Sequence, residues 1–134
     1  MPMAISTTLE TSFAEAVDRT REALSDQGFG VLTEIDVTST LKHKLDEDME
    51  DYLILGACNP PLAHQALGVD RQIGLLLPCN VVVRTDTDKP GSVFVEAMDP
   101  QIMVQVAEQP DLQPAADDAA TRLRAAIAAL TASP

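Results

Sequence analysis

The sequence predicts an α+β fold, namely a two-layer domain with a mostly antiparallel sheet and helices on one side of it. Segments with alternating apolar residues and segments with helical spacing follow in the order strand, helix, strand, short helix, strand, short helix, hairpin, helix. The hairpin makes its strands antiparallel. With 134 residues, 46% of them hydrophobic, the chain is long enough for one domain spanning residues 1–134, with a core at about 5–130.

The first half of the chain begins with an expected strand at residues 5–9, where apolar and polar residues alternate. Ser12 and Glu15 form the pattern of a capping box and start a helix. Residues 31–37 alternate again, as in a half-buried strand. Within residues 38–51 apolar side chains recur every four positions, which indicates a short helix.

The second half contains three expected strands, at residues 52–57, 79–83 and 93–98, of which the last two form the hairpin. A loop is expected at 109–114. Helices are expected at three positions, each marked by a residue that caps the first turn or places a negative charge in it: Asn59, Asp99 and Asp117.

Several of these strands are apolar on both faces. Within 52–57, both Leu53 and Ile54 are apolar although neighbours point to opposite faces, and 93–98 repeats the pattern. The longer helices cover only one face of such a sheet. An apolar open face on a monomer is a site of association. We therefore expect a homodimer that buries this face; the alternative is that the short helices cover it.

The charge and the absence of long apolar segments exclude several classes of function. The chain carries 21 acidic and 9 basic residues, a net charge of −12, which argues against binding nucleic acid or an anionic membrane surface. The longest nearly apolar stretch, 73–83, is interrupted by Pro78 and Asn80, so we expect no membrane span. Residues 1–10 lack the features of a signal peptide, and two cysteines are too few for a disulfide scaffold. We expect a cytoplasmic location.

Cys58 and Cys79 are the candidates for catalysis. Cys58 precedes the expected cap Asn59, and a helix N-terminus stabilises a thiolate. The alternative for both residues is the packing role of most free cysteines. If their strands pair, the two thiols come together, but a separation of 21 residues matches neither a CxxC motif nor a standard zinc spacing.

Other polar residues are candidates for ligand binding, each with a structural alternative. His64 lies on the helix that Asn59 caps and could pair with Cys58, or face solvent. Lys42 and Lys44 form a local positive spot that could receive an anion, or they are balanced by nearby acidic residues. For Asp99, capping is a sufficient role. We expect no metal and no cofactor; the residues that would supply a metal site are Cys58, Cys79 and His64.

Three stretches resemble one protein family: Gly56–His64, Ile73–Val83 and Ala97–Pro100 are similar to the hallmark segments of the bacterial and archaeal domain-of-unknown-function family 302. The resemblance covers about Ile5 to Leu130. It implies an α+β domain with a TATA-binding-protein-like order of elements and a homodimer. It implies no particular activity, and a fold does not by itself define a function.

The sequence leaves two hypotheses about function. The first is a non-catalytic homodimeric module that binds a small ligand or a protein partner. Its ligand-binding candidates are Lys42, Lys44, Asn59, His64, Asn80 and Asp99. The second is a thiol-dependent redox or sulfur-handling protein with Cys58 as nucleophile and Cys79 as resolving thiol, or a metal site built from cysteine and histidine. We favour the first hypothesis, and the sequence leaves open whether the chain catalyses a reaction.

Overall fold

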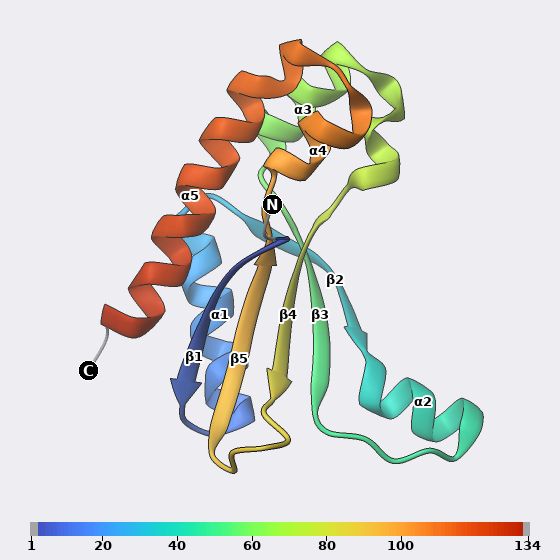
Figure 1. Cartoon of the computed structure of the whole chain (residues 1–134), viewed down its shortest axis with the longest axis vertical. Helices are drawn as coiled ribbons and strands as arrows, with labels where there is room; N and C mark the ends of the chain where they lie inside the picture. The colour runs from blue at the N-terminus through green and yellow to red at the C-terminus, as the bar shows by residue number, and fades with distance from the viewer. Residues whose placement is uncertain (1–2, 133–134) are drawn as a thin grey trace.

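The computed structural model describes residues 3–132 and shows an open, fully antiparallel sheet of five strands in the order β1-β5-β4-β3-β2 (Figure 1). The α+β prediction is confirmed. The elements are β1 (Ala4–Glu10), α1 (Phe13–Asp26), β2 (Gly30–Asp36), α2 (Val37–Leu45), β3 (Tyr52–Cys58), α3 (Pro60–Val69), η1 (Arg71–Leu76), β4 (Cys79–Thr85), β5 (Ser92–Met98), α4 (Gln101–Ala107), η2 (Pro110–Leu112) and α5 (Gln113–Ala132).

The main core lies between one face of the sheet and the two long helices. Alternate residues of the three inner strands point into it and are buried, whereas most of their neighbours point the other way and are half-buried. In Figure 1, α1 lies behind the strands and α5 runs along the left, beside β1, and no helix lies in front of the strands. The buried strand residues are Leu53, Leu55, Ala57, Val81, Val83, Val93, Val95 and Ala97.

The expected cap of α1 is present. The Ser12 side-chain oxygen accepts a hydrogen bond from the Glu15 backbone N–H at 3.2 Å. After α1 the chain turns through Gly28, whose φ of +83° is in the region that favours glycine. The turn directs the next residue, Phe29, into the core.

The interval after β2 is helical over Val37–Leu45 only and then irregular to Asp51. The side chain of Asp36 caps α2, accepting from the Ser39 N–H at 2.9 Å. Within α2 no residue is buried, and Leu45 is 64% exposed. In Figure 1 this helix lies beside the β2 edge of the sheet, so it does not cover the apolar open face.

A second, smaller core forms at one end of the sheet, where α3, η1, α4 and η2 gather (Figure 1). Its buried residues are Ala66, Ile73, Met103 and Leu112. The expected loop at 109–114 is wrong, because η2 leads directly into α5, which begins at Gln113 rather than at Asp117. Pro110 and Pro114 have the φ of a helix start, and burial of Leu112 holds the turn against the core.

Candidate functional site

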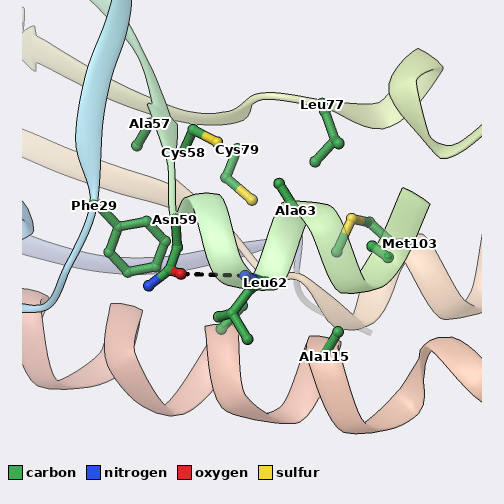
Figure 2. Close-up of a pocket in the computed structure, with 12 residues that line it drawn as sticks. Phe29, Ala57, Cys58, Asn59, Leu62, Ala63, Leu77, Cys79, Met103 and Ala115 are labelled. Atoms are coloured by element: carbon green, nitrogen blue, oxygen red, sulfur yellow. Dashed lines mark hydrogen bonds between the residues drawn. The ribbon is translucent and has the colours of Figure 1, made fainter. Parts of the chain in front are cut away.

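A small apolar cavity lies where the end of β3 and the start of β4 meet α3, α4 and α5. Its volume is about 30 Å³, room for a single water or ion but not for an organic molecule. Figure 2 shows side chains from all these elements around it. The residues lining it are Phe29, Ala57, Cys58, Asn59, Leu62, Ala63, Ala66, Leu77, Cys79, Met103, Ala115 and Ala119.

The antiparallel pairing of β3 with β4 brings the two cysteines together. Ala57 is opposite Cys79, so Cys58 at the end of β3 is the residue directly after the cross-strand partner of Cys79. Both thiols are free, and both line the cavity (Figure 2). The sequence left the distance between the two thiols open, and the register of two strands decides it.

The two thiols differ in environment. Cys58 is half-buried, whereas Cys79 is 7% exposed. Burial, and to a lesser extent the nearby Cys58, raise the pKa of the Cys79 thiol to about 11. Cys79 is therefore a neutral thiol at physiological pH.

Asn59 caps α3, as expected from the sequence. Its Oδ1 accepts a hydrogen bond from the Leu62 N–H at 3.3 Å, shown as a dashed line in Figure 2. The side chain is only 9% exposed and lies so close to Gly28 that a Cβ there would be 3.1 Å from its Nδ2. Asn59 therefore caps α3 and at the same time packs against the α1–β2 turn, beside the thiols.

Met103 also contributes to this cavity, and sequence reasoning missed it. Its side chain lines the cavity from α4, and Figure 2 shows it on the side away from the two cysteines, with Ala63 between them. In the sequence Met103 belongs to the apolar stripe of a short helix, which is typical of core packing. No local pattern distinguishes it from a core methionine.

The histidine and the remaining polar candidates lie elsewhere. His64 is on α3 but exposed, and it is not among the residues that line the cavity. Asn80 is exposed on β4. Asp99 is buried, and its Oδ1 accepts from the Gln101 N–H at 3.0 Å while Arg124 donates to Oδ2 at 3.4 Å. Asp99 thus stabilises the turn before α4, although the N-cap position itself is Pro100.

The two lysines do not form the positive spot considered from the sequence. Lys42 pairs with Asp46 at 3.0 Å and with Asp48 at 3.1 Å, and these two bonds raise its pKa. The surface hollow beside it, of about 260 Å³, includes four carboxylates, those of Asp36, Glu47, Asp48 and Asp51. Lys44 is exposed and does not line this hollow. An anion would therefore meet net negative charge here.

The part of the chain that spans residues 3–132 holds no cluster of three or more His, Cys, Asp or Glu side chains placed to bind a metal ion. None of its helices combines the length and the apolar character needed to cross a membrane.

Comparison with known proteins gives a family but no activity. A crystal structure of an uncharacterised conserved DUF302 protein from Bacillus stearothermophilus is similar to this chain, with a TM-score of 0.86 and 29% sequence identity. The similarity covers 96% of this chain and 98% of the Bacillus chain. No curated protein matches the sequence. The model of the family described as domain of unknown function DUF302 matches residues 5–130, and the chain therefore belongs to this family.

Proposed function

We propose that this protein is a non-catalytic binding module whose open sheet face binds a second copy of the chain. The observation that carries the proposal is an uncovered sheet face with apolar rows and almost no net charge. We define the open face by two rows of cross-strand neighbours: Ile35, Ile54, Val82, Glu96 and Ser6 in one, and Tyr52, Arg84, Phe94 and Thr8 in the other.

The charge of the open face favours self-association. Its two rows carry one cation and one anion, and Arg84 donates to Glu96 at 2.6 Å. The guanidinium also lies 4.4 Å from the centre of the Phe94 ring. Because the whole chain has a net charge of −12, most other surfaces would bring carboxylates together in a symmetric dimer. The open face avoids that repulsion.

The size of the open face is also suitable. Strands spaced about 4.8 Å apart and about 23 Å long give roughly 550 Å² per copy, or roughly 1,100 Å² in a dimer. Stable interfaces bury about 1,200–2,000 Å² in total. The exposed Leu32 on the edge strand β2 and Leu45 on α2 supply additional apolar area beside the face.

A small metabolite fits the molecule less well than a protein partner does. The apolar cavity of about 30 Å³ is far below the roughly 300–1,000 Å³ of ligand pockets. Two larger hollows, of about 260 Å³ beside Lys42 and about 450 Å³ beside Pro110, are open to solvent, and the first is mainly acidic. These features favour a protein partner, and the symmetric charge argument makes that partner a second copy.

Substitution of Val82 tests the proposal. Val82 is half-buried at the centre of the open face, on the middle strand β4. Light scattering at micromolar concentration is expected to give twice the chain mass of 14.3 kDa for the wild type. In Val82→Asp the dissociation constant of the dimer is expected to rise about 100-fold or more, because the interface would bury two unpaired carboxylates, one from each copy.

The control places the same change on a different surface. Val106 on α4 is 61% exposed, and Val106→Asp is expected to leave the mass unchanged. Val82→Lys repeats the test with the opposite charge, and circular dichroism verifies that each variant is folded. A monomeric wild type, or folded Val82 variants that remain dimers, would refute the proposed interface.

The thiol-dependent function remains the second candidate, because the two cysteines line one cavity. With a peroxide as oxidant, the Cys58 sulfur would attack the O–O bond and become a sulfenic acid with release of water. The Cys79 sulfur would then attack that group, releasing a second water and forming a disulfide. The raised pKa of Cys79 makes it a poor resolving thiol, which is why we place this function second.

Alkylation with iodoacetamide distinguishes the two functions. In either case we expect Cys58 to be modified before Cys79, since Cys58 is half-buried and Cys79 buried. If Cys58 is a nucleophile, at pH 7 it reacts at least as fast in the folded protein as in the urea-denatured chain. Intact mass with peptide mapping measures both rates. Thiols that stay unmodified until the chain unfolds would end the thiol-dependent hypothesis.

A further inference from the structure

We propose that the ion pair between Arg84 and Glu96 makes the open face selective for a second copy of the chain. In the dimer, the guanidinium of each Arg84 bonds the carboxylate of the partner's Glu96, so the two ion pairs join into one group of four alternating charges. The inference rests on the dimer proposed above and adds the contact that fixes how its two copies are oriented.

The ion pair lies at the centre of the open face. β4 is the middle strand of the five, and β5 is its neighbour. Val82 on β4 lies opposite Glu96 on β5 in one row, and Arg84 lies opposite Phe94 in the next. A twofold dimer brings the same surface patch of both copies together, and the contact is largest when the axis passes near the middle of the patch. The central residues of one copy then meet those of the other.

Both charged groups keep bonding capacity that a second copy can use. Arg84 Nε donates to Glu96 Oε1 at 2.6 Å, which is the only hydrogen bond of either side chain within residues 3–132. The Nη groups of Arg84 and Oε2 of Glu96 remain for further bonds. Each side chain is 31% exposed, and the guanidinium lies 4.4 Å from the centre of the Phe94 ring. Facing sheets pack about 10 Å apart, a gap that long side chains from both sheets can bridge.

Charge decides between the orientations that two copies can take. An axis through the centre of the face in one direction places each Arg84 against the partner's Glu96. In another direction it places each charged group against its own counterpart. Because like charges repel across a desolvated interface and opposite charges attract, the first orientation is preferred. It also replaces the water that both groups lose on burial, whereas a purely apolar partner surface offers them no hydrogen bond.

Charge reversal in separate chains tests the contact. Arg84→Glu places two anions at the centre of the face, and Glu96→Arg places two cations there. Each variant alone is expected to dimerise about 100-fold more weakly than the wild type or worse, because the like charges of two copies meet. In an equimolar mixture we expect a heterodimer at least about 10-fold tighter than either homodimer, and native mass spectrometry distinguishes the three by mass. A mixture that stays as monomeric as its separate components would overturn the proposal.

A second test keeps one cation and one anion in every chain, so that folding does not depend on a like-charged pair. The double variant Arg84→Glu/Glu96→Arg is expected to dimerise with itself about as tightly as the wild type does. With the wild type it is expected to form mixed dimers at least about 10-fold more weakly, since each charged group then faces a like charge. Mixed dimers in the statistical proportion would overturn the proposal.

The ion pair between Arg122 and Asp118 on α5 gives the matched control. It is also held by a bond from Nε, at 2.8 Å, and it lies outside the two rows of the open face. Arg122→Glu and Asp118→Arg, alone or mixed, are expected to leave the dimer unchanged. If Val82→Asp abolishes a wild-type dimer but the mixed charge-reversed chains do not associate, only the charge contact is refuted. A monomeric wild type would refute both the contact and the dimer.

Discussion

Replacing Leu55 with alanine is expected to lower the free energy of unfolding by about 3–4 kcal/mol, because it leaves a cavity under the centre of the sheet. Leu55 is fully buried (0% exposed) on the inner strand β3 and belongs to the main core between the sheet and α1 and α5. The neighbouring backbone is held by strands on both sides, so the site has little freedom to collapse around the smaller side chain. Urea unfolding measures the loss.

A surface leucine gives the matched control for this prediction. Leu75 in η1 is 84% exposed, and Leu75→Ala is expected to change stability by less than about 0.5 kcal/mol. The variants are compared at one protein concentration, because a dimer's stability depends on concentration. A loss below about 1 kcal/mol for Leu55→Ala would contradict the placement of this side chain in the main core.

Ionisation of Cys79 alone is expected to lower the free energy of unfolding by about 2–3 kcal/mol between pH 9 and pH 11. In the folded chain burial, and then the neighbouring Cys58, raise the pKa of this thiol from its ordinary value of 9.0 to about 11. Above pH 9 the unfolded chain loses the proton while the folded chain keeps it. Deprotonation therefore favours the unfolded state until the folded thiol also ionises near pH 11.

The variant Cys79→Ala isolates this contribution from those of lysine and tyrosine. Urea midpoints are measured under reducing conditions at pH 8, 9, 10 and 11 for both chains. The stabilisation that the thiol provides is complete below pH 9, so the wild type should lose more stability than the variant only above that pH. Parallel pH profiles for the two chains would show that Cys79 is not buried as a neutral thiol.

Most elements could be predicted from the sequence because their signals are local. The strands expected at 5–9 and 93–98 are observed as Ala4–Glu10 and Ser92–Met98, and Ser12 and Asn59 cap the helices that they were expected to begin. Alternation and capping depend only on residues within one or two turns of the chain. The start of α5 was expected too late, since the buried Leu112 draws the preceding turn onto the small core.

The candidate site was only partly predictable. Cys58 and Cys79 were singled out by residue type and by the cap that follows Cys58, and both line the cavity. His64 was also a candidate from the sequence, as a partner of Cys58, but its position on α3 leaves it exposed. Met103 was indistinguishable from a core methionine, because a short amphipathic helix does not reveal which of its side chains will meet a distant strand.

By itself, the sequence determined the α+β class, the strands, the helix caps, the excess of negative charge and the apolar character of both strand faces. Only the tertiary structure decided that β4 pairs with β3 in the register that places Cys58 near Cys79, that Met103 of α4 lines the same cavity, and that no described helix covers the open face. The physical reason is that periodicity specifies which way a side chain points along its own element. Which distant side chains meet depends on strand order, register and helix packing, and these follow from the burial of the whole core.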